Sequence, residues 1–250
     1  MLTITAPAAN ARKSFLIVIP AHNEEKIIRY KIRTVLEYLN GKNLGVNWKI
    51  LVAENGSKDR TLKELEKIPQ SRHFSYVSLP VRSRSKALLL AWLSNDADYY
   101  MFMDADLSTD IKHIPELVKF LKKDYDIVIG SRRLKKSQVK RLFLRKVLSS
   151  CFHFLMKLIF GVKIQDYQCG FKAFNRKIKE RILPQLKYTD EGFLDTEMMV
   201  VANSKGYTIK EIPVKWYDTR PSKFKIYRSI YMNLLNSFRI KRDLILGRYK

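Results

Sequence analysis

The chain has 250 residues, with 48 lysines and arginines against 24 aspartates and glutamates. Its length suits one main α/β domain with a sizeable core, and its formal net charge of +24 favours polyanionic partners: nucleic acid, anionic lipid or phosphorylated substrates. The two cysteines, Cys151 and Cys169, exclude a disulfide framework and a cysteine metal site. Neither low-complexity linkers nor repeat periods divide the sequence.

Up to Gly130, short apolar runs alternate with helical patterns. Such runs are typical of buried strands, and the alternation predicts a mostly parallel, twisted sheet with helices on both faces. The predicted strands are Phe15–Pro20, Trp48–Ala53, Ser75–Leu79, Tyr99–Met103 and Asp126–Ile129, and the predicted helices run from Asn23 to Leu39, from Asp59, and over Ser85–Leu93.

Beyond Gly130 the sequence becomes basic and amphipathic. Residues 131–165 hold ten lysines and arginines and no acid, and residues 221–250 hold eight against the single Asp243. Apolar residues recur there at helical spacing, which predicts helices at about 141–160 and over Tyr227–Leu246. A helix is also expected at Thr196–Ser204 and an alternating strand at Tyr207–Trp216. We expect a flexible tail (1–13), a domain (14–222) and a basic amphipathic segment (223–250).

Four polar clusters directly follow predicted strands. In doubly wound α/β sheets, ligands bind beyond the carboxyl ends of the strands, so these clusters are expected to form one site. The clusters are His22–Glu25, Glu54–Ser57, Asp104–Asp106 and Gly130–Arg133.

Asp104 and Asp106 place two carboxylates in the turn after the predicted strand Tyr99–Met103. Two hard oxygen ligands this close suit Mg²⁺ or Mn²⁺, which would neutralise a diphosphate leaving group. The alternative is that Asp106 or Ser108 caps a helix starting near Ile111. The position after a buried central strand favours the metal site.

Six short motifs occur in an order that resembles family 2 glycosyltransferases, especially the polyprenyl-phosphate hexosyltransferase branch with its dolichyl-phosphate mannosyl- and glucosyltransferases. The resemblance implies a GT-A fold and inverting transfer of a hexose from a donor of the GDP-mannose or UDP-glucose type to a polyprenyl (dolichyl) phosphate. The motifs are Pro20–Glu24, Glu54–Asp59, Met103–Asp106, Gly130–Arg132, Gln168–Lys172 and Phe193–Glu197.

The same resemblance implies roles on the donor side. Glu54 and Asn55 stand where the family usually has two aspartates beside the base and ribose, and Lys86 would approach the nucleotide. Asp104 and Asp106 match the metal and nucleotide positions. Pro20, Ala21, Asn23 and Glu24 would line the nucleotide pocket.

On the acceptor side, a phosphate is already anionic and needs cations rather than a general base. Arg132 and the pair Arg145 and Ser149 match the family's phosphate-holding positions, and the missing acids in this stretch favour anion binding over a solvated helix face. Asp195 and Glu197 would lie beside the sugar. Their alternative role is to complement a helix dipole.

The two amphipathic helices are expected to lie in the headgroup layer of an anionic membrane, at its cytoplasmic face. The most apolar stretch, Leu142–Phe160, contains Arg145, Lys146 and Lys157 and falls short of the roughly 20 apolar residues that a spanning helix needs, which predicts peripheral association. Alternatively, these helices pack on the domain or in a homo-oligomer.

Two other functions stay open at this point. A glycan or protein hydroxyl acceptor would need a general base, for which Asp195 or Glu197 are candidates. A basic nucleic-acid-binding module would explain the charge but not Asp104 and Asp106, and we expect no nucleic-acid partner.

Overall fold

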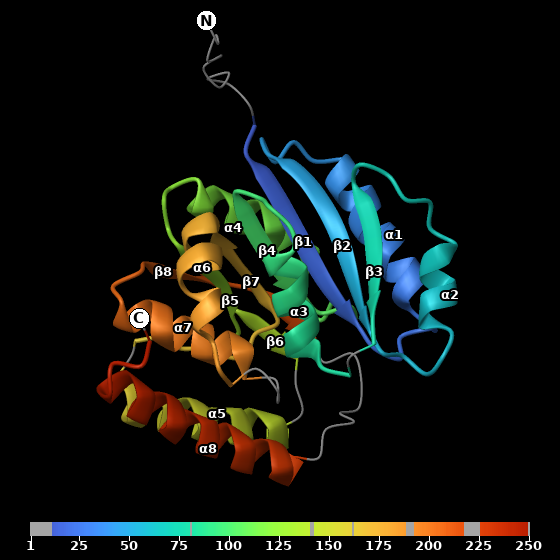
Figure 1. Ribbon diagram of the computed structural model, residues 1–250. Helices are drawn as coiled ribbons and strands as arrows, with labels where there is room; N and C mark the ends of the chain where they lie inside the picture. The colour runs from blue at the N-terminus through green and yellow to red at the C-terminus, as the bar shows by residue number, and fades with distance from the viewer. Residues whose placement is uncertain are drawn as a thin grey trace, which may run out of the picture.

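The computed structural model describes residues 12–80, 82–140, 143–161, 163–188, 193–217 and 226–249. Within these ranges a seven-stranded sheet forms the centre of the molecule (Figure 1). Its strand β7 is antiparallel to its neighbours β4 and β5, and the other paired strands run parallel. The order across the sheet is β3 (Phe74–Leu79), β2 (Asn47–Asn55), β1 (Ser14–Ala21), β4 (Tyr99–Met103), β7 (Phe171–Asn175), β5 (Ile127–Ser131) and β8 (Ile209–Pro213).

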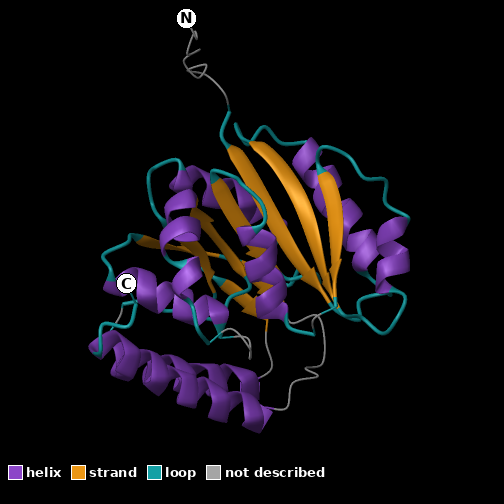
Figure 2. Cartoon of the chain, in the orientation of Figure 1, coloured by secondary structure: helices purple, strands orange, loops and turns teal. Residues whose placement is uncertain are grey.

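The central strands are apolar on both sides because helices cover both faces of the sheet, as predicted. On one face, alternate β1 residues such as Ile17 pack with helices α1 (Ile28–Asn40), α2 (Thr61–Glu66) and α4 (Ile114–Leu121). On the other, Val18 and its alternates pack with α3 (Arg84–Leu93), α6 (Arg176–Arg181) and α7 (Leu194–Ser204). Figure 2 shows these layers with the strands between helices.

Two long helices, α5 (Phe143–Phe160) and α8 (Ile226–Ile245), lie side by side outside this sandwich (Figure 1). Met156 and Ser237 are buried between them, with the serine hydroxyl 3.4 Å from the methionine sulfur. Phe152 of α5 meets Phe193 edge-on, at 6.5 Å between ring centroids, and so joins the pair to the start of α7. The pair lies on the side of the molecule to which the carboxyl ends of β1 and β2 point (Figure 1).

Most predicted elements agree with the structure to within a few residues. Helix α6 was not predicted, and further differences concern the strands and the start of the first helix. The segment predicted as one strand at Tyr207–Trp216 divides into β8 and β9 (Lys215–Tyr217), and β9 pairs with the short β6 (Gln138–Lys140) in a second sheet. Strand β7, in the middle of the main sheet, was not predicted. The first helix begins at Ile28, five residues after the predicted Asn23.

The predicted tail and segment boundaries remain predictions. Residues 1–11 of the expected tail lie outside the described residues, as do residues 218–225 around the expected boundary. The described part of the last segment is α8 and the turn after it.

Candidate active site

The loops after β1 and β2 form one hydrogen-bonded unit at the carboxyl edge of the sheet. Asn23 has a left-handed backbone (φ 55°), which asparagine tolerates better than most residues. Its amide N–H donates to the Ser57 hydroxyl (3.0 Å), and its side-chain oxygen accepts from the Lys58 amide (2.8 Å). The Glu24 amide donates to the Thr61 hydroxyl (2.7 Å). Pro20 and Ala21 end β1 directly before this unit.

Glu54 and Asn55, at the end of β2, are both buried, but among the described residues only Glu54 has hydrogen-bond donors for its side-chain oxygens. The Glu54 carboxylate accepts hydrogen bonds from the Ser57 amide and from the Ser78 hydroxyl (2.6 Å). Among the described residues, the side-chain oxygen of Asn55 has no hydrogen-bond partner. A buried acceptor without a donor is costly, so this oxygen is a candidate acceptor for an N–H or O–H group of a ligand.

Asp104 and Asp106 lie in the turn after β4, next to the β1 loop, because β1 and β4 are adjacent and parallel. Asp106 accepts a hydrogen bond from the Ser108 amide (2.9 Å), which stabilises a turn with Leu107 in the left-handed region (φ 54°). The next helical turn is capped by Asp110, which accepts a hydrogen bond from the Lys112 amide, and not by Asp106 or Ser108.

Gly170 forms the floor beneath Asp104. Its carbonyl accepts from the Asp104 amide (3.2 Å), and a Cβ atom at position 170 would lie 1.9 Å from the Asp104 Oδ2. A side chain at position 170 would force the Asp104 carboxylate to move, so its present place depends on the glycine. This close approach explains why the motif preceding β7 contains glycine.

Two ion pairs surround the Asp104 carboxylate on the α3 and α7 side. Arg84 Nη2 lies 2.9 Å from Asp104 Oδ1, and both side chains are partly exposed. Lys172 Nζ lies 2.9 Å from Asp195 Oδ2, and the lysine is completely buried. Burial alone would lower the pKa of Arg84, but the charges of Asp104 and Asp195 outweigh it and raise that pKa. Positive and negative groups therefore alternate along this edge.

The residue of the first α3 turn that contacts Asp104 is Arg84, and the predicted approach of Lys86 to the nucleotide stays a prediction. Both belong to the first turn of α3, which Ser83 caps by accepting from the Lys86 amide (3.3 Å). Residues two apart in a helix point to different sides, so only one can face Asp104. The Lys86 side chain is exposed.

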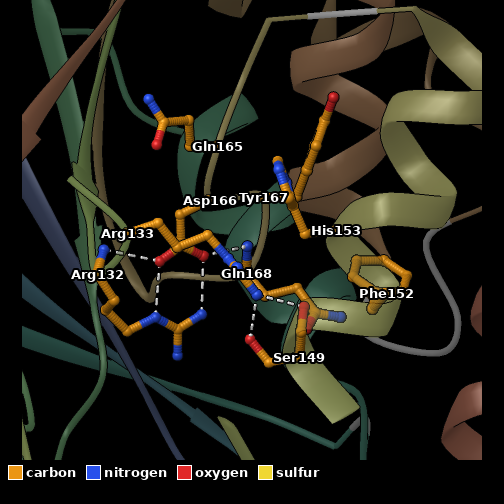
Figure 3. Close-up of a pocket in the computed structure, with 9 residues that line it drawn as sticks. All are labelled: Arg132, Arg133, Ser149, Phe152, His153, Gln165, Asp166, Tyr167 and Gln168. Atoms are coloured by element: carbon orange, nitrogen blue, oxygen red, sulfur yellow. Dashed lines mark hydrogen bonds and ion pairs between the residues drawn. The ribbon is translucent and has the colours of Figure 1, made fainter. Parts of the chain in front are cut away.

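Arg132, predicted to hold the acceptor phosphate, is already paired with a carboxylate. Its Nε and Nη2 atoms lie 2.7 and 2.8 Å from the two oxygens of Asp166, as Figure 3 shows. Burial opposes ionisation of Asp166, but Arg132 outweighs it and lowers the Asp166 pKa to about 2. The argument from missing acids was wrong for Arg132, because Asp166 follows directly after the acid-free stretch and compensates its charge.

The neighbouring Arg133 contacts the predicted Ser149 instead. Its Nη2 donates to the Ser149 hydroxyl (2.7 Å) and to the Ser149 carbonyl, which joins the end of β5 to α5. Among the described side chains it has no acidic ion-pair partner, and burial lowers its pKa. Arg145 lies on α5 one turn before Ser149, but its side chain is outside the described residues.

These groups line a small pocket between β5 and α5 (Figure 3). Arg133 and Ser149 meet on one wall, and the Arg132–Asp166 pair forms another. The ring nitrogen Nδ1 of His153, also in this lining, is buried and has no hydrogen-bond partner among the described residues.

Glu197 does not share the surroundings of Asp195, and the prediction that both lie beside the sugar stays a prediction. Its buried carboxylate accepts from the amides of Lys187 and Tyr188 (both 2.8 Å) and from the Tyr249 hydroxyl (2.8 Å). Two positions apart on α7, the two acids point to different sides. Glu197 thus fastens the end of the described chain to α7.

Most of the predicted site residues fall into two groups, while Lys86 is exposed and the Arg145 side chain lies outside the described residues. The first group, called the donor edge after its predicted role, unites the β1 loop, the β2 end, Asp104, Asp106 and Asp195, and gains Arg84 and Lys172. The second group, between β5 and α5, unites Arg132 and Ser149 with Arg133 and Asp166. Glu197 belongs to neither.

Several known proteins are similar to this chain in sequence. Residues 16–183 match the family described as Glycosyl transferase family 2. The glycosyltransferase AglD of Haloferax volcanii is 31% identical over 228 residues, which cover 90% of this chain and 36% of that longer protein. The dolichyl-phosphate beta-glucosyltransferase of Dictyostelium discoideum is 30% identical over 248 residues, covering 94% of this chain and 76% of that protein. The human protein of that name is 30% identical, over 84% of this chain and 69% of its own length.

Solved structures share the fold. Glucosyl-3-phosphoglycerate synthase from Mycobacterium tuberculosis, crystallised with UDP, superposes with a TM-score of 0.67 at 18% identity, covering 90% of this chain and 80% of that one. Its complex with Mn²⁺, UDP-glucose and phosphoglyceric acid gives 0.69 at 16% identity, covering 92% and 79%. The predicted α/β fold of the GT-A type is confirmed. The chain belongs to glycosyl transferase family 2 and is a glycosyltransferase, with curated relatives in the dolichyl-phosphate hexosyltransferase branch, as its ordered motifs predict.

Proposed function

We propose that the protein transfers a hexose, glucose in preference to mannose, from a nucleotide-sugar to a polyprenyl or dolichyl phosphate at a membrane surface. The observation that carries this proposal is the Arg133–Ser149 contact, which puts an arginine without an acidic partner among the described side chains between the donor edge and the amphipathic helix α5. The names of the relatives favour glucose and a dolichyl-phosphate acceptor.

A divalent metal fits the donor edge. The Asp104 side chain is 42% exposed, and the bare Gly170 backbone leaves room for its carboxylate. Within the described residues no cluster of three or more His, Cys, Asp or Glu could hold a metal by itself. Asp104 and Asp106 would therefore share Mg²⁺ or Mn²⁺ with diphosphate oxygens, as such ions require. The bound ion would stabilise the negative charge of the departing diphosphate.

Nucleotide binding falls to the first two loops. The orphaned oxygen of Asn55 would accept an N–H group of the base or a ribose hydroxyl, where an aspartate would carry a charge. Glu54 is engaged with Ser57 and Ser78 and would shape the pocket instead. The β1 loop, tied to Ser57 and Lys58, would form the pocket wall.

The transfer itself needs no proton abstraction. An oxygen of the acceptor phosphate attacks the anomeric carbon while the bond from that carbon to the diphosphate breaks on the opposite face, which inverts the configuration. Arg133 and Ser149, with Arg145 one helical turn away, would hold the acceptor phosphate. Arg132, neutralised by Asp166, would position the Arg133 backbone rather than bind the lipid.

A hydroxyl acceptor on a glycan or protein is less consistent with the site. Its candidate bases are both engaged, because Asp195 is paired with buried Lys172 and Glu197 accepts three hydrogen bonds. A general base must reach the hydroxyl proton, and carboxylate oxygens that already have these partners are not free to do so.

The helix pair α5 and α8 is the proposed membrane contact. Large apolar side chains stand exposed on both helices, at Phe154, Leu158, Phe238 and Ile245, although the helices pack against each other. Lys157, Arg239 and Arg242 are exposed beside them and would attract anionic headgroups. None of the described helices is long and apolar enough to cross a membrane. The cytoplasmic face of the membrane is proposed because nucleotide-sugars are cytoplasmic substrates.

The experiment supplies radiolabelled UDP-glucose or GDP-mannose, Mn²⁺ and dolichyl phosphate in liposomes containing phosphatidylserine. We expect label in the lipid extract with UDP-glucose, and none with Asp104→Asn. Flotation with these liposomes, beside a gel-shift assay with DNA and RNA, separates membrane association from nucleic-acid binding. Transfer to a free glycan but never to lipid, or to neither with a folded protein, would contradict the proposal.

A further inference from the structure

Arg84 forms an ion pair with Asp104, one of the two carboxylates that the metal would need. Its guanidinium donates to Asp104 Oδ1 at 2.9 Å and lies over the ring of Phe102, 5.1 Å from the centroid. The Arg84 side chain is 34% exposed and begins helix α3, at the same edge of the sheet as the β1 and β2 loops. Arg84 therefore contacts a predicted metal ligand from a helix that begins at the edge of the sheet where the predicted nucleotide pocket lies.

We propose that Arg84 exchanges partners when the donor binds. Without nucleotide, it neutralises Asp104. When the nucleotide-sugar arrives, the guanidinium moves to the diphosphate, and Asp104 becomes available to the metal. The inference rests on the proposed donor site and adds a residue that neither the motifs nor the resemblance assigns to it.

An exchange requires an ion pair that can separate, and the two ion pairs of this edge differ in how exposed they are to solvent. Lys172 and Asp195 are enclosed, with side-chain exposures of 0% and 8%, and separating them would strand buried charges. Arg84 and Asp104, at 34% and 42%, both reach solvent, and exposed pairs of this kind hold together only weakly. Of the two pairs, only Arg84–Asp104 can separate at small cost.

The chemistry of the diphosphate suits arginine. Its oxygens accept paired hydrogen bonds in the planar geometry of a guanidinium, which lysine does not offer. Lys172 and Asp195 stay in place beneath, so Asp195 continues to attract Arg84 and keeps it at the edge during the change.

The exchange makes donor and metal binding depend on each other. Metal alone must displace a cation from Asp104, whereas metal with diphosphate finds that cation already drawn away. Coupling of this kind is reciprocal: whatever factor the diphosphate adds to metal affinity, the metal adds to diphosphate affinity. A free nucleoside diphosphate chelates metals by itself, so the measurement that tests the exchange is the change in metal and diphosphate affinity when Arg84 is removed.

The test measures Mn²⁺ binding by electron paramagnetic resonance, with and without UDP, and UDP binding by calorimetry without metal. Wild type is compared with Arg84→Ala and Arg84→Lys. The matched control is Arg176→Ala, which removes another exposed arginine, 3.8 Å from Asp98 and away from the donor edge. Circular dichroism checks that each variant is folded.

We expect Arg84→Ala to bind Mn²⁺ alone about 5-fold more tightly, since a competing cation is gone. It should bind metal-free UDP about 10-fold more weakly, since charge-assisted hydrogen bonds are lost. UDP should then enhance Mn²⁺ affinity less than in wild type. Arg84→Lys should keep the competition for Asp104 but lose most of the UDP affinity. Arg176→Ala should match wild type throughout.

Weaker Mn²⁺ binding by Arg84→Ala without nucleotide would overturn the inference, because Arg84 would then merely orient Asp104. Unchanged Mn²⁺ and UDP affinities would overturn it as well. Should wild type bind neither Mn²⁺ with UDP nor Mn²⁺ with GDP, the proposed donor site fails and the inference fails with it. Binding without lipid transfer would contradict the acceptor proposal alone.

Discussion

The donor edge and the pocket between β5 and α5 both contain cationic side chains, but the two regions differ in which of these cations has a carboxylate partner. At the donor edge, Arg84 and Lys172 each have a carboxylate partner, and one of the two pairs is open to solvent. In the pocket, two consecutive arginines are treated differently: Arg132 is locked to buried Asp166, while Arg133 has only the hydroxyl and carbonyl of Ser149 among the described contacts of its guanidinium. The partner, and not the residue type, decides which cation remains available for a phosphate.

The largest effect is expected from Gly170→Ala, which disturbs the donor edge. The new methyl group would overlap Asp104, so the carboxylate must move and transfer should fall by about 100-fold or more. Mn²⁺ binding measured by electron paramagnetic resonance should weaken in parallel. Gly41→Ala is the control, since its Cβ would meet only ordinary contacts at 3.6 Å and beyond. Full activity in Gly170→Ala would rule out Asp104 as a metal ligand in this position.

Lys172→Met tests whether the buried pair is structural. Asp195 would be left as a buried charge without a partner, which costs about 3–5 kcal/mol of unfolding free energy. Lys179→Met removes a lysine that pairs with exposed Asp96, and should cost about 1 kcal/mol or less. Urea unfolding followed by fluorescence measures both. Equal losses would contradict the distinction between enclosed and open pairs.

Substitutions of the two neighbouring arginines should affect different properties, stability at Arg132 and acceptor binding at Arg133. Arg132→Gln should lower the unfolding free energy by about 3 kcal/mol, because Asp166 loses its bidentate partner. Arg133→Gln should leave stability nearly intact but raise the KM for lipid phosphate about 10-fold, through lost charge-assisted hydrogen bonds. Thermal unfolding and the liposome assay are run on both. The reverse assignment, with Arg132→Gln affecting only KM, would restore the original prediction for Arg132.

Asp166 should also leave a signature in the pH dependence of stability. Its pKa is about 2 in the folded protein against an ordinary 3.8, so its contribution is complete above that ordinary value and disappears as the pH falls toward 2. The loss amounts to about 2 kcal/mol. The difference in unfolding free energy between wild type and Asp166→Asn should shrink over this range, measured by urea titration at successive pH values. A difference that stays constant with pH would show that Arg132 does not stabilise the charged form.

The smallest effect is expected at Tyr249, far from both arginine clusters. Tyr249→Phe removes one of three hydrogen bonds to buried Glu197 and should cost about 1 kcal/mol. Tyr30→Phe, at an exposed position on α1, should cost nothing measurable in the same thermal unfolding experiment. A strong loss of transfer activity in Tyr249→Phe at unchanged stability would give Glu197 a role in the site after all.

The sequence predicted the parallel half of the sheet because strands covered on both faces are continuous apolar runs. The same rule missed β7, whose run Phe171–Phe174 is interrupted by Lys172. That lysine is tolerated in the core only because Asp195, distant in sequence, neutralises it. A search for short apolar runs cannot reveal a charged partner that is distant in the sequence.

Positions that follow from place along a strand could be predicted, and side-chain partners could not. Asp104 and Asp106 follow their strand and lie at the expected edge. The contact of Arg84 with Asp104 depends on the phase of a helix turn, and the pairing of Arg132 depends on Asp166, one residue past the stretch whose charges were counted. Only the fold brings such partners together.

The reversed direction of β7 gives the intervening segment an unusual independence. Strand β5 ends, and antiparallel β7 begins, at the same edge of the sheet, so the chain from Arg132 to Gly170 leaves and returns at neighbouring points. It carries α5 and part of the small second sheet between these two anchors. Gly170 at the end of the excursion still supports Asp104, and α5 within it packs on Ser237 and Phe193, so the part that can be exchanged is shorter than the whole excursion. A chimaera that replaces only the exposed residues of α5 would change the proposed acceptor side and leave the strands of the proposed donor edge unaltered.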